Sequence, residues 1–178
     1  MTFTTNITAR AELNVSGGCI GDTYNFLAAH IHWPHSEHLI TGRDFVGEAH
    51  FIHQNTRKQE FAVFGFFFTL ANSSTTSDSG SDSWNDILGT LNNRTITLNG
   101  GLASLMKGNT ERFVCYNGSL TTPPCGEGIH WILVSSAIPI SQSHITRLQN
   151  GIGTSFFRDT QPVNGRPVRR SFASTSWN

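Results

Sequence analysis

Alternating polar and apolar residues run through much of this chain, and a period of two is typical of half-buried strands. The alternation covers residues 2–15, and strands are also predicted over residues 23–33 and 44–53. Pro34 ends the second of these segments, because proline donates no hydrogen bond to a sheet. Residues 61–70 are apolar at nearly every position, as expected of a central strand that is buried on both faces.

The second half of the chain adds two short helices to this pattern. Apolar residues recur at helical spacing over 84–91, where Ser83 is placed to cap the helix, and residues 141–148 form a second helical candidate. The polar, low-complexity segment 72–83 is predicted to be a solvated loop. Strands are predicted to outnumber helices, with two more over 112–116 and 128–136 on either side of the turn-rich segment 117–126.

The length and charge of the chain then indicate a single domain and argue against a nucleic-acid-binding or membrane-spanning protein. A chain of 178 residues is long enough for one domain with a sizeable core, so residues 1–178 are interpreted as a single domain. Basic and acidic residues number 12 each without a basic block, so the electrostatic pattern of a nucleic-acid binder is missing. Apolar runs stay well short of the roughly 20 residues that span a bilayer, and the first residues lack the pattern of a signal peptide.

One weak signal nevertheless favours a secreted protein. Five asparagines fit the N-glycosylation pattern, which is short and often arises by chance; they are Asn6, Asn14, Asn72, Asn93 and Asn117. The three cysteines, Cys19, Cys115 and Cys125, are an odd number, so one is free or pairs outside the chain. Their spacing does not indicate a metal site.

The candidate chemistry lies in residues 29–55, which hold six of the eight histidines: His30, His32, His35, His38, His50 and His53. In a strand His30 and His32 point to one face, and an antiparallel neighbour can add His50. Three histidines around an open fourth position are typical of catalytic zinc. A single histidine on a half-buried strand is more often a hydrogen-bonded core residue, but six in one stretch favour the metal. Spacing alone neither selects His50 over His53 nor excludes His35 and His38.

Longer motifs give the chain a resemblance to a known family. They are His30-Ile-His-Trp33, Ser36-Glu37-His38, Glu48-Ala-His50-Phe-Ile-His53-Gln-Asn55, Gly118-Ser-Leu-Thr-Thr-Pro-Pro-Cys125, Glu127-Gly-Ile-His-Trp131 and Gln161-Pro-Val-Asn-Gly-Arg-Pro167. In this order, from Gly17 to Phe172, the blocks resemble the alpha-class carbonic anhydrases. The resemblance implies a mainly β (α+β) fold, with a large central, mostly antiparallel sheet and a few short helices.

The same resemblance implies a role for each candidate site residue. Zinc would be held by His30, His32 and His50, with Glu48 orienting His50, while His38 and His53 become structural. Thr121 would accept the proton of zinc-bound hydroxide and donate its own to Glu37. The substrate would contact residues of an apolar wall and a neighbouring threonine, namely Ile52, Val63, Leu120, Trp131 and Thr122.

The chain also departs from the family pattern. Family domains extend upstream of the strand that begins here near Met1, and that segment carries the proton-shuttling histidine. No residue of this chain is assigned that role. Ala28 stands where the family commonly has a glutamine bound to the first zinc ligand. Cys125 matches a cysteine whose usual partner lies in the upstream segment, which leaves Cys19 or Cys115 as substitutes.

These observations predict a zinc carbonic anhydrase, a lyase that reversibly hydrates carbon dioxide to bicarbonate and a proton. The expected partners are the small substrates alone, with no nucleic acid and no membrane span. A first alternative is a carbonic-anhydrase-like binding or matrix domain with little turnover, because the upstream segment and proton shuttle are absent. A second is a zinc hydrolase that acts on esters.

Overall fold

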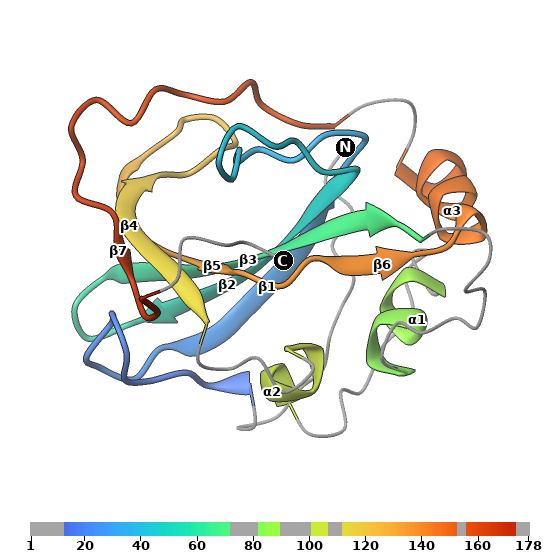
Figure 1. The fold of residues 1–178 in the computed structure, drawn as a ribbon. Coiled ribbons are helices and arrows are strands. Elements are labelled where there is room, and N and C mark those ends of the chain that lie inside the picture. Colours follow the sequence, from blue (N-terminus) through green and yellow to red (C-terminus); the bar gives the residue numbers. More distant parts are fainter. Residues whose placement is uncertain (1–12, 72–81, 90–100, 107–111, 153–155, 174–178) are drawn as a thin grey trace.

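The computed structural model describes residues 13–71, 82–89, 101–106, 112–152 and 156–173. Its centre is one twisted sheet, in the order β1-β2-β3-β5-β4-β7, with β6 paired to β3 off this path (Figure 1). The strands are β1 (Asn25–His32), β2 (Gly47–Asn55), β3 (Glu60–Leu70), β4 (Phe113–Ser119), β5 (Glu127–Val134), β6 (Ile138–Ile140) and β7 (Arg169–Arg170). Three short helices are α1 (Asp82–Gly89), α2 (Gly101–Leu105) and α3 (Gln142–Ile152).

The pairing of the strands confirms the expected fold class. β3 runs parallel to β5 and β6, and the other pairings within the described strands are antiparallel. The sheet is therefore mixed but mostly antiparallel. The parallel pairing of β3 with β5 is possible because α1, α2 and β4 lie between these two strands in the sequence.

Two apolar clusters cover the two faces of the sheet. On one face, Phe64, Phe66 and Phe68 of β3 pack with residues of all three helices, including Trp84 and Leu148. On the other face, alternate residues of the same strand pack in a smaller cluster that includes Val63, Phe67, Trp131 and Leu133. The helices thus shield one face (Figure 1), and the other face is left for the histidines.

Most predicted elements are present with shifted ends. Residues 61–70 form β3 and are buried at most positions, and the strands expected over 23–33 and 44–53 are β1 and β2. Within the early strand predicted over 2–15, residues 2–12 lie outside the described residues, while Val15 forms an isolated antiparallel bridge with Tyr24. The loop expected over 72–83 lies almost entirely outside them.

The predicted cap of the first helix is wrong. Helix α1 already includes Asp82, so Ser83 lies inside the helix rather than before it. The helix expected over 141–148 begins at Gln142 as α3, and the amide of His144 donates to Ser141 Oγ at 3.4 Å. Ser141 is therefore the residue that caps α3. Among the described residues, no helix is long and apolar enough to cross a membrane.

Candidate metal centre

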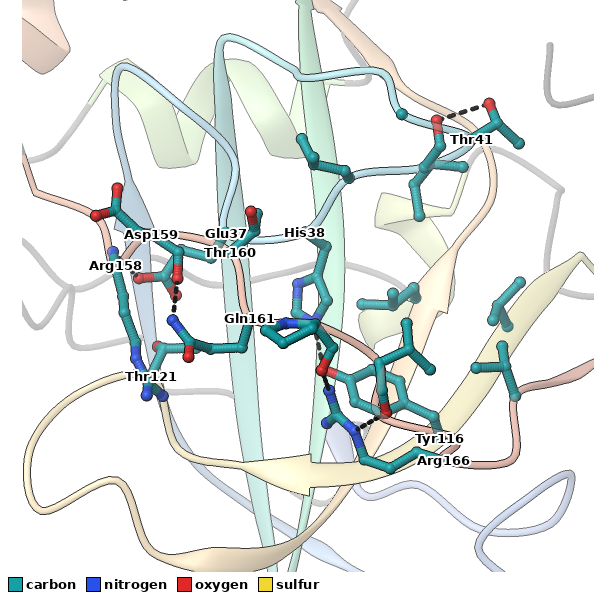
Figure 2. A pocket seen from close by; sticks show the side chains of 18 of the residues that line it. Glu37, His38, Thr41, Tyr116, Thr121, Arg158, Asp159, Thr160, Gln161 and Arg166 are labelled. Carbon is teal, nitrogen blue, oxygen red and sulfur yellow. Dashed lines mark hydrogen bonds between the residues drawn. The ribbon is translucent and has the colours of Figure 1, made fainter.

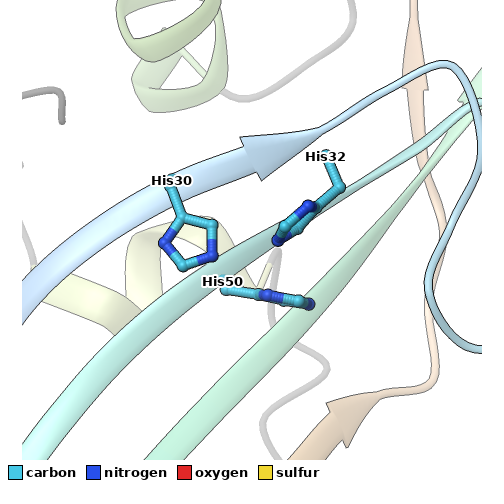
Figure 3. A group of neighbouring side chains, drawn as sticks. All are labelled: His30, His32 and His50. Carbon is cyan, nitrogen blue, oxygen red and sulfur yellow. The ribbon is translucent and has the colours of Figure 1, made fainter. Parts of the chain in front are cut away.

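Three histidines converge on the face of the sheet that the helices leave open. β1 and β2 pair with His30 opposite His50, which places both rings beside His32 (Figure 3). The ring centroids lie 4.8 Å apart for His30 and His32, 5.2 Å for His30 and His50, and 4.5 Å for His32 and His50. One nitrogen from each ring lies within 4.8 Å of the others, so a single ion between them can be reached by all three.

The hydrogen bonding of these rings fits a metal ion. Among the described residues, the buried Nε2 atoms of His30 and His32 have no hydrogen-bond partner. Burial, reinforced by His50, lowers the pKa of His30 to about 3 and that of His32 to about 2. Both imidazoles are therefore neutral near pH 7, and a neutral nitrogen with a free lone pair is the form that binds zinc.

A buried carboxylate fixes the orientation of the third ring. The Nε2 atom of His50 lies 2.9 Å from Oε1 of Glu48, which leaves Nδ1 directed to the shared space. Glu48 is fully buried and also accepts hydrogen bonds from the amides of Glu37 and His38, at 2.9 and 3.0 Å. Burial alone raises the pKa of Glu48, but His38 and His50 hold it well below its usual range. The carboxylate is thus charged, as an orienting partner of a ligand histidine should be.

His38 and His53 occupy different settings from the three converging histidines. His38 Nδ1 bonds to Glu48 at 2.7 Å and its Nε2 to the hydroxyl of Tyr116 at 2.5 Å, so both nitrogens are engaged. His38, Glu48 and His50 form a second group of possible metal ligands, but Glu48 is already hydrogen-bonded to both histidines. His53 lies on the opposite face of β2, where its ring contacts Phe26 and Phe64.

Glu37 and Thr121 meet beside the centre through a contact distant in sequence. Glu37 Oε1 lies 3.2 Å from Nδ1 of His32 and accepts a 2.6 Å hydrogen bond from the amide of Arg158. Burial raises the pKa of Glu37, and interactions with His50, Thr121 and Arg158 partly oppose this. Its buried Oε2 atom has no hydrogen-bond partner of normal geometry in the described part of the chain. It lies 3.9 Å from Nδ1 of His50, and Thr121 lies close enough to lower the pKa of Glu37. This oxygen is free to accept a proton from a neighbouring hydroxyl.

The residues expected to form an apolar wall lie on the same face as the histidines. Val63 and Trp131 are buried in the second cluster, and Ile52 and Leu120 pack against it. The Trp131 ring contacts that of His50 at 4.7 Å, and its Nε1 donates to the carbonyl of Ser119. Thr122 lies in the following turn, where its carbonyl accepts a hydrogen bond from the amide of Cys125.

The segment that completes the site was not predicted from the sequence. The Phe156 carbonyl lies 3.2 Å from His32 Nδ1, and the Phe156 ring stacks on that of His32. Arg158 then reaches Glu37. These residues follow His32 by more than 120 positions and belong to no local motif, so the sequence carried no signal for them.

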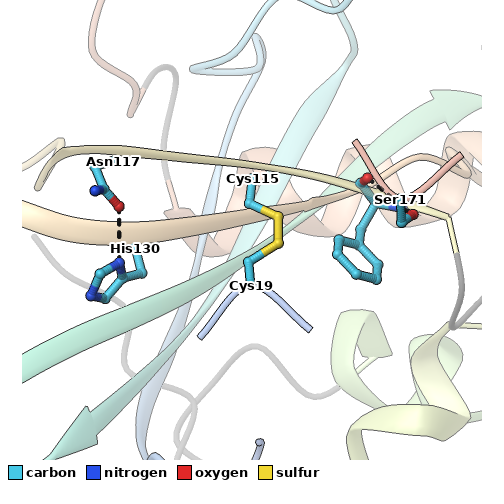
Figure 4. Close-up of a disulfide and its surroundings, with 6 residues drawn as sticks. Cys19, Cys115, Asn117, His130 and Ser171 are labelled. Atoms are coloured by element: carbon cyan, nitrogen blue, oxygen red, sulfur yellow. Dashed lines mark hydrogen bonds between the residues drawn. A yellow bond between two sulfur atoms is a disulfide. The ribbon is translucent and has the colours of Figure 1, made fainter. Parts of the chain in front are cut away.

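The cysteines pair in a way that neither expected substitution anticipated. Cys19, which precedes β1, forms a disulfide with Cys115 of β4 (Figure 4), and Cys125 is free. The expectation that Cys19 or Cys115 replaces the upstream partner of Cys125 is therefore wrong. The reason is geometric, because Cys115 projects from β4 toward the turn that holds Cys19, with the two Cα atoms 6.5 Å apart.

Comparison with known families now assigns the chain. The family model described as eukaryotic-type carbonic anhydrase matches residues 1–172. The chain belongs to this family. Among curated relatives of the carbonic anhydrase family, carbonic anhydrase 6 of Canis lupus familiaris is 29% identical over 179 residues, covering 86% of this chain and 56% of its own length. Carbonic anhydrase of Neisseria gonorrhoeae is 33% identical over 149 residues, covering 83% and 56%.

Solved carbonic anhydrases share the fold. The alpha-carbonic anhydrase of Photobacterium profundum is 26% identical with a TM-score of 0.69, and the match covers 94% of this chain and 77% of that one. A carbonic anhydrase of Chlamydomonas reinhardtii in complex with acetazolamide is 27% identical with a TM-score of 0.65, covering 84% and 66%. The chain thus spans a little over half the length of the curated carbonic anhydrases named above.

Proposed function

We propose that this chain reversibly hydrates carbon dioxide with a zinc ion held by His30, His32 and His50. The observation that carries the proposal is the pair of buried, unpartnered Nε2 atoms on His30 and His32, facing the ring of His50. Outside a metal site, such atoms would lose hydrogen bonds to water without compensation. Membership of the carbonic anhydrase family supports the same metal and the same reaction.

Each protein group has a distinct task in this proposal. When bound, zinc lowers the pKa of a coordinated water from about 15.7 to about 7, which supplies hydroxide at neutral pH. Glu48 holds the ring of His50 with Nδ1 toward the metal. Thr121 would accept a hydrogen bond from that hydroxide and donate its own proton to the buried Glu37 beside it. This pairing orients the attacking oxygen toward the substrate.

The apolar wall would bind the substrate and exclude water. Val63 and Trp131 are fixed by the core, so they offer a rigid surface for a small uncharged molecule. Ile52 and Leu120 are only partly buried, which leaves part of each side chain for substrate. Carbon dioxide has no hydrogen-bond donor, and such a surface suits it better than it suits water.

The test is a joint measurement of zinc content and hydration rate. The purified chain, equilibrated with zinc, should bind about one ion and accelerate hydration in a stopped-flow pH-indicator assay, with inhibition by acetazolamide. Turnover should rise with added imidazole buffer, because no residue here is assigned to carry protons to solvent. One bound zinc with no hydration above buffer would refute the enzyme and favour the binding-domain alternative. Faster ester hydrolysis than carbon dioxide hydration would favour the hydrolase.

We also propose an extracytoplasmic location. The Cys19–Cys115 disulfide is typical of oxidising compartments, and Asn14 and Asn117 of the glycosylation pattern are exposed. Asn6, Asn72 and Asn93 lie outside the described residues. Family membership alone does not decide location, since one relative is named as the mitochondrial carbonic anhydrase 5A of Rattus norvegicus.

A further inference from the structure

A cavity of about 830 Å³ lies beside the candidate metal centre, and most of its lining has no task in the proposed reaction. Its walls are the turn 39–42, the sheet face at Val114 and Leu133, and the segment 158–168, here called the C-terminal strap. Figure 2 shows Glu37, His38 and Thr121 at the same cavity as Arg158 and Arg166. The volume falls within the range of small-molecule sites, roughly 300–1,000 Å³.

Several apolar side chains that line this cavity are exposed to solvent. Five large apolar residues are exposed in the described part of the chain, and Leu39, Val163 and Val168 are three of them, at 47%, 53% and 54%. All three line the cavity, above a floor that includes the buried Val114 and Leu133. Exposed apolar side chains that cluster in this way on a protein surface indicate a binding site.

The charged part of the lining favours an anion. Arg158, Arg166 and Arg170 line the cavity, against the two acidic residues Glu37 and Asp159. Glu37 is buried and accepts a hydrogen bond from the amide of Arg158, and even with both acids ionised the three arginines exceed them by one charge. The arginines therefore leave an excess of positive charge at the cavity.

The arginine side chains differ in how firmly they are held. Arg166 is fixed, because its Nε and Nη2 donate to the carbonyls of Val163 and Pro162 and its guanidinium lies 5.1 Å above the ring of Tyr116. Arg158 Nη1 forms two long hydrogen bonds of 3.4 Å, to Ser119 Oγ and the Leu120 carbonyl. Arg158 can readily give up such long hydrogen bonds to bind a carboxylate, because guanidinium binds a carboxylate more strongly than it binds an uncharged oxygen.

We propose that this cavity binds an amphiphilic organic anion, with an apolar body against Leu39, Val163 and Val168 and a carboxylate toward the arginines. The three converging histidines do not line the cavity, and the proposal does not rest on the proposed reaction. Its inner end includes His38, which bonds to Glu48 and to Tyr116. A bound anion would thus lie next to the hydrogen-bond chain that orients His50.

Decanoate, below its critical micelle concentration, is the probe, and isothermal titration calorimetry is the measurement. We expect one binding site with the same affinity in zinc-free and zinc-loaded protein, and much weaker binding of decanol, which lacks the charge. Binding confined to zinc-loaded protein would overturn the proposal, because the carboxylate would then be a metal ligand. Absence of binding in both forms would overturn it equally. Neither outcome bears on whether the zinc-loaded protein hydrates carbon dioxide.

Two neighbouring residues of β7 provide a matched pair of variants. Arg170 lines the cavity, whereas Arg169 lines a smaller one next to the disulfide, and both are exposed. Arg170→Glu should weaken decanoate binding roughly tenfold or more, and Arg169→Glu should change it by less than about twofold. Equal effects would show non-specific attraction and would refute the site. Val168→Glu, checked for folding by near-ultraviolet circular dichroism, provides a second variant with the same expected loss.

Discussion

His50 and His53 lie three residues apart on β2, and replacing each with alanine should have opposite effects. His50→Ala should remove most of the zinc affinity and change folding stability less. His53→Ala should destabilise the fold and leave the affinity for zinc nearly unchanged. The reason is that the two side chains project from opposite faces of the strand, one toward the converging histidines and the other into the core beside Phe26 and Phe64.

The size of the His53 effect follows from its contacts. The side chain is fully buried, and its two nitrogens each lie 3.0 Å from a backbone carbonyl, of Phe51 and of Leu13. Burial lowers its pKa to about 4, so the ring is neutral at pH 7 and donates one hydrogen bond. Removing the ring loses that hydrogen bond and leaves a cavity, for a cost of about 3–5 kcal/mol. For a domain with a stability of about 5–15 kcal/mol, the change is large.

The size of the His50 effect follows from ligand number. Structural zinc sites with four ligands bind with roughly 10–16 kcal/mol, or about 2.5–4 kcal/mol for each ligand. Loss of His50 should therefore weaken zinc binding by roughly 60- to 700-fold, at about 1.4 kcal/mol for each factor of ten. Zinc affinity is measured by competition with a chromophoric chelator, and stability by urea unfolding of the metal-free protein. Equal loss of zinc affinity in the two variants would refute the assignment of ligands.

Three further perturbations test other parts of the structure. A Cβ at Gly65 would lie 2.9 Å from Glu48 Oε1, so Gly65→Ala should cost about 1–3 kcal/mol in urea unfolding and weaken zinc binding about tenfold; unchanged zinc affinity would contradict the role of Glu48. The metal-free protein should lose stability as the pH falls from about 6.5 toward 4, because the unfolded chain takes up a proton on His53 before the folded chain does, and His53→Gln should reduce this slope. Cys125→Ser should leave no reactive thiol in the unreduced, urea-unfolded chain, whereas Cys19→Ser should leave two; two thiols in Cys125→Ser would mean a different pairing.

The local geometry of the site was predictable because strand alternation is a short-range rule. His30 and His32 had to share a face, as did Glu48 and His50, once the two segments were strands. The observed register pairs His30 with His50 and His32 with Glu48, so the shared faces become a shared site.

The hydrophobic pattern of the sequence could not decide between His50 and His53 as the third ligand. Both faces of β2 are buried, so the hydrophobic pattern does not reveal which face holds the core and which holds a polar site. In the structure, the side chains of β3 decide it. Phe64 packs beside His53, whereas Gly65 lies opposite His50 and leaves space for Glu48.

Contacts between segments far apart in the sequence could not be predicted either. The parallel pairing of β3 with β5, the hydrogen bond from Arg158 to Glu37, and the disulfide between Cys19 and Cys115 each join parts of the chain far apart in sequence. No short motif encodes such pairs, since they depend on how the whole sheet is assembled. The cavity below the C-terminal strap arises in the same way.

The disulfide divides the chain into a closed ring and the two segments outside it, residues 1–18 and 116–178. All three converging histidines, with Glu37 and Glu48, lie inside the ring that Cys19 and Cys115 close across 96 residues. Thr121 and Arg158 lie outside it. A single backbone cut within the ring would leave its two pieces covalently joined, whereas a cut after Cys115 would release the residues that complete the site. One backbone cut can therefore separate Thr121 and Arg158 from the three histidines, whereas the histidines themselves stay covalently linked.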